Sequence, residues 1–292
     1  VDAGHPRPPP PTTHPTMFES IALLAPTASP ASLIGCAILL LLAVKAYKCH
    51  THGGCSRCCH AKEMRLQYFD IPGRAEMIRL ALAIGKLKFK DERLSREAWK
   101  EGTDKATTPF GQLPVLFVDG EPLAQSHAIL RFVGRLARLY PCSAFKAAKA
   151  DEIVFLVEDM FGLLAPTFSM DEEAKIAARK ALVAGKLGEM WARLDAILAD
   201  KEYFVADRLT VADVAVFSMA GTLASGWLSG VDKGMFRAYP RVQAHREMMA
   251  ALPQVREFYA GLSEGTKEAY TTMGIDVAAY SSPAKQQQGA TA

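Results

Sequence analysis

The chain has 292 residues, 22% of them charged and half of them hydrophobic, which is the composition of a globular protein with room for about two domains. Its 34 Lys and Arg against 31 Asp and Glu leave a net charge of +3, which disfavours a polybasic nucleic-acid-binding protein and excludes an acidic-tail protein. Five of the six cysteines lie in the first 60 residues, so the longer remainder, with only Cys142, has no internal disulfide. This distribution fits a reducing compartment.

Residues 1–63 form an atypical N-terminal region. Residues 1–16 are rich in Pro, Thr and His and cannot bury a core, so we expect disorder there and a native start at Met17. A proline-rich ligand for a partner domain is the alternative for these residues.

Residues 31–47 are strongly apolar and predict a transmembrane or targeting helix. At about 1.5 Å per residue they span roughly 26 Å, close to the ~30 Å hydrocarbon core of a bilayer. The positive residues follow this segment, from Lys45 to Arg65, which places the rest of the chain in the cytosol if the segment is an uncleaved anchor. A leader that is cleaved is the alternative, and it would leave the protein soluble in the cytoplasm or in an organelle.

Residues 49–60 hold four cysteines and three histidines directly after the apolar segment. S-palmitoylation, an undirected linker and a metal site all remain open for this stretch. Cys55 and Cys58 form half of a zinc site, but no second pair follows at finger-like spacing. We therefore predict no bound metal.

Residues 64–141 alternate between strand and helix patterns in the order β-α-β-α-β-β-α. The expected elements are strand 64–69, helix 74–84, strand 88–93, a short helix or loop after Ser95, strands 115–118 and 121–124, and helix 126–139 with Ser126 as its N-cap. Asp119-Gly120 is typical of the type I′ turn of a hairpin. One crossover followed by a hairpin predicts a small mixed sheet with helices on its faces.

Residues 142–262 show only helical patterns, so we predict an α/β domain followed by an all-α domain, with the boundary near Pro141. The expected helices are 144–164, 171–198, 210–228, 240–251 and 253–259. Residues 263–292 are rich in Ala, Ser and Gln and are expected to fray as a flexible tail.

Two short motifs in the first domain predict contacts to a small ligand. Pro114 immediately precedes a strand, where a cis bond would expose the main chain of Leu113 for pairing with an extended peptide; a simple strand start is the alternative. Gln125 and Ser126 open a helix, whose N–H groups and positive dipole end suit a carboxylate, although Ser126 is equally explained as a plain cap.

Tyr68 ends the first strand, at the edge where open α/β sheets hold their ligands. Its hydroxyl there could donate a hydrogen bond to a thiolate, whereas an isolated tyrosine is by default a core residue. Arg74 begins the next helix near the same edge, and Trp99 and Lys105 lie in the loop that would close over a ligand. Together these residues predict a pocket for a small peptide with a carboxylate at each end.

Several ordered motifs resemble the sigma class of cytosolic glutathione transferases, a class that includes a glutathione-dependent prostaglandin isomerase. They are residues 68–76 (YFDIPGRAE), 108–116 (TPFGQLPVL), 118–120 (VDG), 123–131 (LAQSHAILR), 151–154 (DEIV) and 209–213 (LTVAD). The resemblance spans about residues 64–259. It implies a thioredoxin-like glutathione-binding domain at 64–141 and an all-helical substrate-binding domain at 142–262.

The resemblance also implies roles for individual residues. Tyr68 would activate the thiol of glutathione, and Arg74 would tune the electrostatic field around it. The residues implied to bind glutathione are Tyr68, Arg74, Trp99, Lys105, Gln112, Leu113, Pro114, Gln125, Ser126 and Asp159, the last reaching the ligand of a partner subunit. Those expected by position to line the hydrophobic substrate site are Ile71, Met160 and Phe161. Thr210 and Asp213 resemble the family's capping box and are assigned to folding.

The resemblance implies a dimeric enzyme, a glutathione transferase that joins the thiolate of its co-substrate glutathione to hydrophobic electrophiles, including lipid-derived hydroperoxides or isomerase-type substrates. We expect no metal and no nucleic-acid partner, and a membrane tether that holds the catalytic domain on the cytosolic side. A non-catalytic scaffold of the same fold, as in lens crystallins, is the alternative. A thioredoxin-type redox protein is disfavoured because the sheet domain contains no Cys-x-x-Cys.

Overall fold

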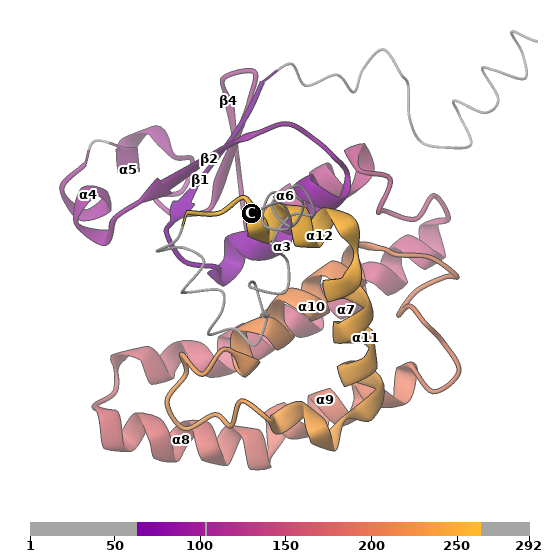
Figure 1. The fold of residues 1–292 in the computed structure, drawn as a ribbon. Coiled ribbons are helices and arrows are strands. Elements are labelled where there is room, and N and C mark those ends of the chain that lie inside the picture. The colour runs from indigo at the N-terminus through magenta and orange to yellow at the C-terminus, as the bar shows by residue number, and fades with distance from the viewer. Residues whose placement is uncertain (1–62, 103, 264–292) are drawn as a thin grey trace, which may run out of the picture. The chain divides into compact units, whose positions relative to one another are not determined.

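The computed structural model describes residues 63–102 and 104–263 (Figure 1). The predicted apolar helix at 31–47, the cysteine-rich segment at 49–60 and the tail beyond residue 263 therefore lie outside the described residues. The predictions of palmitoylation, of a linker or of a metal site at 49–60, and of a fraying tail, concern those parts of the chain.

Four strands form one mixed sheet in the order β2-β1-β3-β4. The strands are β1 (Met64–Phe69), β2 (Lys90–Leu94), β3 (Val115–Val118) and β4 (Glu121–Ala124). β1 pairs in parallel with β2 and antiparallel with β3, and β4 returns from β3 as a hairpin. The hairpin turn holds Asp119 and Gly120 at φ of +51° and +91°, the left-handed conformations that this dipeptide predicts.

The helices of this sheet half alternate with its strands, which confirms the predicted thioredoxin-like order. They are η1 (Gly73–Ala75), α3 (Glu76–Ile84), α4 (Arg96–Glu101), α5 (Asp104–Thr107) and α6 (Ser126–Leu136). Helices α3 and α6 pack together between the sheet and the helical half of the protein (Figure 1). Ser95 caps α4 as expected, because its hydroxyl accepts a hydrogen bond from the Ala98 N–H at 3.0 Å.

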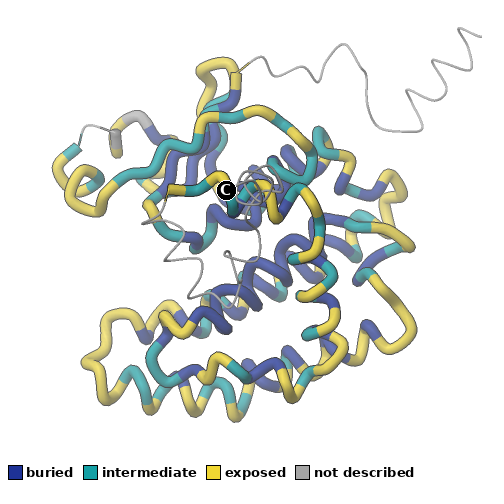
Figure 2. Tube along the Cα trace, in the orientation of Figure 1, coloured by how far each residue is buried: buried dark blue, intermediate teal, exposed yellow. Residues whose placement is uncertain are grey.

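Every element after Ala144 in the described residues is helical, as predicted. The elements are α7 (Ala144–Leu164), η2 (Ala165–Ser169), α8 (Glu172–Ala184), α9 (Lys186–Ile197), α10 (Val211–Ala224), η3 (Met235–Ala238), α11 (Pro240–Ala251) and α12 (Pro253–Ala260). All residues of α10 are buried, so this helix forms the centre of the core (Figure 2). Its N-terminus carries the predicted capping box, with the Thr210 N–H donating to Asp213 at 2.8 Å.

Two helix predictions in this half are wrong in extent. The segment predicted as one helix at 171–198 is two helices, because Gly185 leaves the helical conformation at φ −116° and ψ −119°. The chain turns tightly there, and a Cβ on Gly188 would lie 2.4 Å from the Val183 carbonyl oxygen. The helix predicted to reach residue 228 ends at Ala224, before Gly226 with its φ of +75°.

The prediction of a transmembrane, membrane-anchored protein is corrected. Across residues 63–102 and 104–263, no helix combines the length and the apolarity needed to cross a bilayer. Among the helices of these described residues, α7 is the longest with 21 residues, but lysines, aspartates and glutamates interrupt its sequence AFKAAKADEIVFLVEDMFGLL. Such charges are costly in the hydrocarbon core of a membrane.

Direct contacts join the helical half to α3 and α6. The Tyr259 hydroxyl on α12 donates to the buried carboxylate of Glu76 at 2.8 Å, and the Val211 N–H donates to the Leu139 carbonyl at 2.9 Å. Gly134 on α6 permits a close approach, because a Cβ there would lie 2.4 Å from a methyl group of Val211. These contacts hold α10 and α12 of the helical half against α3 and α6.

Candidate functional site

Tyr68 lies near the C-terminal end of β1, and only 7% of it is exposed. Its hydroxyl accepts a hydrogen bond from the backbone N–H of Arg74 at 3.2 Å. Burial raises the pKa of Tyr68 above 10, against the opposing effects of that hydrogen bond and of the positive charges of Arg74, Arg79 and Arg96. The phenol therefore stays protonated at neutral pH and can donate a hydrogen bond to an anion.

Gly73 makes this position of the hydroxyl possible. It has a φ of +45°, and a Cβ at this residue would lie 2.6 Å from the Tyr68 hydroxyl oxygen. A side chain would therefore be strained by its backbone and would displace the phenol as well.

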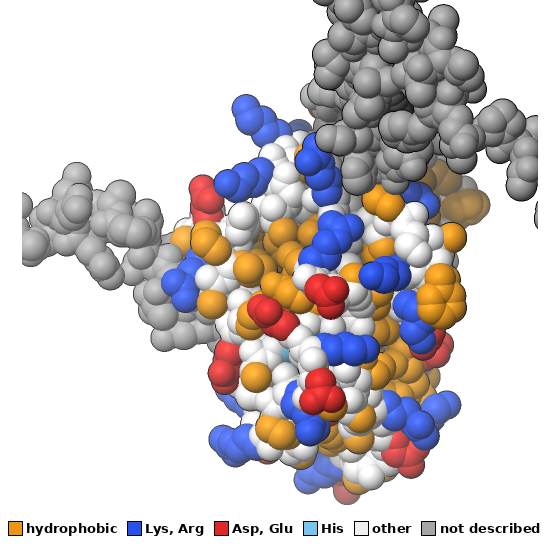
Figure 3. Space-filling view, turned by 90° about the vertical axis from the view of Figure 1, so that its right-hand side faces the viewer, with side chains coloured by type: hydrophobic (Ala, Val, Ile, Leu, Met, Phe, Trp, Pro, Cys, Tyr) orange, Lys and Arg blue, Asp and Glu red, His pale blue; other side chains and the backbone are white. Residues whose placement is uncertain are grey.

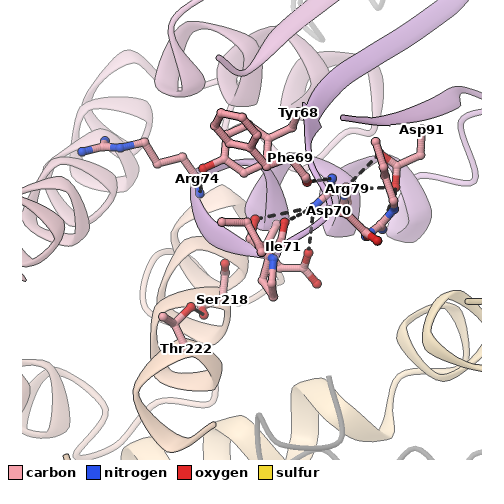
Figure 4. A network of polar contacts seen from close by, with 12 residues as sticks. Tyr68, Phe69, Asp70, Ile71, Arg74, Arg79, Asp91, Ser218 and Thr222 are labelled. Carbon is pink, nitrogen blue, oxygen red and sulfur yellow. Dashed lines mark hydrogen bonds and ion pairs between the residues drawn. The ribbon is translucent and has the colours of Figure 1, made fainter. Parts of the chain in front are cut away.

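A fully buried arginine fixes the turn that follows Tyr68 (Figure 4). Arg79 on α3 donates to the carbonyl oxygens of Phe69 at 3.2 Å and Ile71 at 2.8 Å. Its charge is compensated by Asp91 at 3.1 Å and by Glu76 at 3.6 Å. Arg79 was not identified from the sequence. The signal for it was a charged residue within the apolar run EMIRLALAI of α3, a helix in which residues 76–82 are all buried.

A cavity of about 510 Å³ lies beside this turn. It is lined by Arg74, Trp99, Lys105, Gly111, Gln112, Leu113, Pro114, Ala124, Gln125, Ser126 and Glu158. All the residues predicted to bind glutathione line it except Tyr68 and Asp159. The wall is mostly polar and carries two cationic groups, Arg74 and Lys105, against the one carboxylate of Glu158, so it suits a polar ligand with negative charge.

The sheet side of the cavity exposes main-chain groups. The Leu113–Pro114 peptide bond is cis, one of the two predicted arrangements. Gln125 has a φ of +71° and is the N-cap of α6, and its side chain makes no capping hydrogen bond. The prediction of Ser126 as the N-cap is wrong. Gln125 is the N-cap, and Ser126 is the first residue of the helix. The helix N-terminus points its N–H groups toward an anion in either case.

The outer residues of the predicted site lie at different depths. Lys105 is exposed, with its Nζ 5.9 Å from the centre of the Trp99 ring. Asp159 is exposed on α7 and does not line the cavity. Met160 is fully buried in the core, so it presents no surface to a ligand in this conformation. Ile71 is half-buried, and so is Phe161, whose ring lies 5.3 Å from the Arg74 guanidinium carbon.

Glu158 lines the cavity from the helical half and was missed by sequence reasoning. It forms an ion pair with Arg74, and its Oε2 lies 3.5 Å from Nε2 of His127. The sequence spacing could have identified Glu158: it follows Asp151 by seven residues, about two helical turns, and so lies on the same face of α7. Asp151 on that face accepts a hydrogen bond from Arg131 of α6 at 2.8 Å.

No group of three or more His, Cys, Asp or Glu side chains that could hold a metal ion occurs in the described parts of the chain. On the face shown in Figure 3, Lys and Arg side chains are interspersed with Asp and Glu, and apolar patches lie between them. The cavity, with Arg74 in its wall and the Tyr68 hydroxyl bonded to the Arg74 N–H, is thus the site that the geometry identifies.

Comparisons with known proteins cover both halves of the structure. The family model "Glutathione S-transferase, N-terminal domain" matches residues 64–135, and "Glutathione S-transferase, C-terminal domain" matches residues 158–261. Hematopoietic prostaglandin D synthase of Gallus gallus is 35% identical over 191 residues, covering 65% of this chain and 92% of that protein. Glutathione S-transferase 1 of Ascaris suum is 33% identical over 204 residues, covering 68% of this chain and 96% of that protein.

Solved structures agree with these matches. A glutathione S-transferase from Ascaris lumbricoides has a TM-score of 0.58 at 31% identity, covering 70% of this chain and 99% of that one. Prostaglandin synthase D of Nilaparvata lugens has a TM-score of 0.62 at 26% identity, covering 68% of this chain and 98% of that one. The similarity therefore extends over the sheet, the cavity and the helices behind it.

Proposed function

This chain belongs to the glutathione S-transferase family, and from that premise we propose that its cavity binds glutathione with the thiol beside the Tyr68 hydroxyl. As a family member the chain is a glutathione transferase, an enzyme of glutathione-dependent transfer or isomerisation. We assign the glutathione-binding domain to residues 64–141 and the second-substrate domain to residues 142–262. The sigma class fits its similarity to the prostaglandin D synthases.

The observation that carries this proposal is the protonated phenol of Tyr68, whose hydroxyl is hydrogen-bonded to the backbone of the cavity-lining residue Arg74. A thiol has an ordinary pKa of about 8.5, and a hydrogen bond to its anion lowers that value. Lowering it by one unit raises the thiolate fraction at neutral pH several-fold, and the thiolate is the nucleophile. Tyr68 would donate this bond, and the Arg74 charge would add to it.

The remaining lining residues would orient the tripeptide. Leu113 would offer its main-chain N–H and C=O two residues before β3, where an extended cysteinyl unit can pair. Gln125 and Ser126 would hold the γ-glutamyl carboxylate at the N-terminus of α6. Trp99, Lys105 and Gln112 would contact the glycyl end.

The second substrate would be a hydrophobic electrophile held beside Ile71 and Phe161. Both side chains are half-buried near Arg74, whereas the buried Met160 would support Phe161 from behind. Lipid-derived hydroperoxides are one substrate class for such a site. An isomerase-type substrate is the second, and the similarity to enzymes named prostaglandin D synthase favours it. Assays of both classes with the same enzyme would rank them.

A homodimer is proposed from exposed apolar side chains. Phe155 on α7 is 46% exposed and Phe110 beside the cavity is 65% exposed. Large exposed aromatics are typical of interfaces, and Asp159 on the same helix could then reach the ligand of the partner subunit. Sedimentation of the full chain as a monomer would contradict this assembly.

Tyr68→Phe tests the proposed function. Glutathione conjugation to a small aromatic electrophile is expected to fall about tenfold or more in kcat/KM, which corresponds to at least about 1.4 kcal/mol of transition-state stabilisation. Tyr239→Phe is the matched control, because it removes a hydroxyl that bonds the Gly188 carbonyl in the helical half. If wild type and Tyr68→Phe are equally slow yet both bind a glutathione matrix, the crystallin-like scaffold replaces the enzyme.

A further inference from the structure

His127 lies directly behind the cavity wall, one residue after Ser126 on α6. Its side chain is only 14% exposed. Its ring packs against Phe155 of α7, with the ring centres 5.4 Å apart. Nε2 is buried and makes no hydrogen bond with any described residue. A buried ring nitrogen without a hydrogen bond is unusual, so the polar group closest to it is of interest.

That neighbour is Glu158, whose Oε2 faces two basic groups. The oxygen forms the ion pair with the Arg74 guanidinium and lies 3.5 Å from His127 Nε2. A charge-assisted N–H···O bond spans about 2.7–2.9 Å, so the His127 contact is too long to be one. The arrangement is that of a neutral imidazole beside a carboxylate already paired with arginine.

The surroundings of His127 favour this neutral form. Burial lowers the pKa of His127 below its ordinary value of 6.5, and the nearby charges of Arg74 and Arg131 act in the same direction. Glu158 and Asp151 on α7 oppose them. These four residues are the charged groups that face the ring from η1, α6 and α7. A proton therefore binds the ring only in mild acid, where Glu158 is the carboxylate within reach.

We propose that His127 is a positioning residue that couples solvent protons to the Arg74–Glu158 pair at the cavity. When the ring takes a proton from solvent, Nε2 becomes a cationic donor and competes with Arg74 for the same Glu158 oxygen. The carboxylate moves toward His127, and the Arg74 guanidinium loses its counter-charge. Arg74 lines the cavity, and its positive charge acts on the Tyr68 hydroxyl, to which its backbone N–H also donates a hydrogen bond.

The consequence for catalysis rests on the proposed function. An uncompensated Arg74 stabilises the glutathione thiolate more strongly, because a nearby positive charge favours the anionic form. Thiol protonation in mild acid would then be partly offset by His127 protonation. The thiolate fraction should fall less steeply below about pH 6.5 than it would with an uncharged residue in place of His127.

The first experiment needs no glutathione. In the full chain, the ring nitrogens of His127 are titrated by NMR in wild type, in Glu158→Gln and in Glu152→Gln. Glu152 is the matched control because it is an exposed carboxylate on the same helix that pairs with Lys149. His127 is expected to titrate below pH 6.5 and to shift further down in Glu158→Gln only. A pKa at or above 6.5, or equal values in both variants, overturns the proposal.

The second experiment measures the ultraviolet absorbance of the bound thiolate at saturating glutathione, in wild type and His127→Gln. Near pH 5.5 the wild type is expected to hold about threefold more thiolate, equivalent to about half a pKa unit. Parallel curves overturn the coupling to the thiol. If neither protein binds glutathione, the proposed function fails, and the NMR titration alone decides whether His127 and Glu158 are coupled.

Discussion

The sheet half and the helical half of this protein use buried polar groups differently. In the sheet half, the polar groups around Tyr68 end at a cavity, and the backbone adopts positive φ at Gly73 and Gln125 to place them there. In the helical half, Asp213 is fully buried and accepts hydrogen bonds from the N–H groups of Phe204 at 3.0 Å and Thr210 at 2.8 Å. His245 lies 3.1 Å from the same carboxylate.

This difference indicates that the buried polar groups of the sheet half form the site, whereas those of the helical half stabilise the fold. In the sheet half, backbone conformations with positive φ hold the polar groups in the geometry that the site needs. The Asp213 carboxylate is fully buried and satisfies backbone donors at the start of the central helix α10, so this cluster stabilises the fold. Substitutions in the two clusters should therefore separate loss of activity from loss of folding.

Asp213→Ala should have the largest effect. It leaves buried N–H groups of Thr210 and Phe204 without an acceptor and removes the charge beside His245, so the free energy of unfolding should fall by about 3–5 kcal/mol. Urea denaturation measures this change. Asp171→Ala is the control, because Asp171 caps α8 through one exposed bond to Ala174 and should cost about 1 kcal/mol. Equal losses in the two variants would contradict a special role for the buried cluster.

Gly73→Ala should come second and should act mainly on activity. The added Cβ would meet the Tyr68 hydroxyl at 2.6 Å, so the phenol must move and kcat/KM should fall at least about tenfold. Gly162→Ala on α7 is the matched control, because nothing lies within 4 Å of its added Cβ. That variant should keep its activity and gain up to about 1 kcal/mol of stability. Full activity in Gly73→Ala would contradict the proposal that activity depends on the position of the Tyr68 hydroxyl.

The smallest expected effect is a change in the pH dependence of stability. The folded state lowers the pKa of His127, so the unfolded chain binds a proton first as the pH falls below 6.5. His127 therefore contributes stability above that pH and loses it in mild acid. Urea unfolding at about pH 7.5 and pH 5.5 should show a smaller loss in His127→Gln than in wild type. An identical loss would assign the acid sensitivity to other groups.

Local patterns were sufficient for much of the fold. The strand at 64–69, the Asp119-Gly120 hairpin and the capping box at Thr210 were predicted because each depends on neighbours within a few residues. The motifs around Tyr68 and Gln125 likewise carried the family resemblance, and most of the predicted glutathione-binding residues line one cavity. The helix break at Gly185 was missed because a glycine inside a helical pattern does not reveal how tightly the chain will turn.

Contacts between distant segments explain what local patterns missed. Arg79 acts on a turn several residues before it, and Glu158 meets Arg74 across 84 positions of sequence. Whether Met160 or Phe161 faces the site depends on how α7 is rotated against the sheet half, which its own sequence does not specify. The shared Glu158 oxygen between Arg74 and His127 has the same origin: three segments with no common local pattern become neighbours when the two halves pack together.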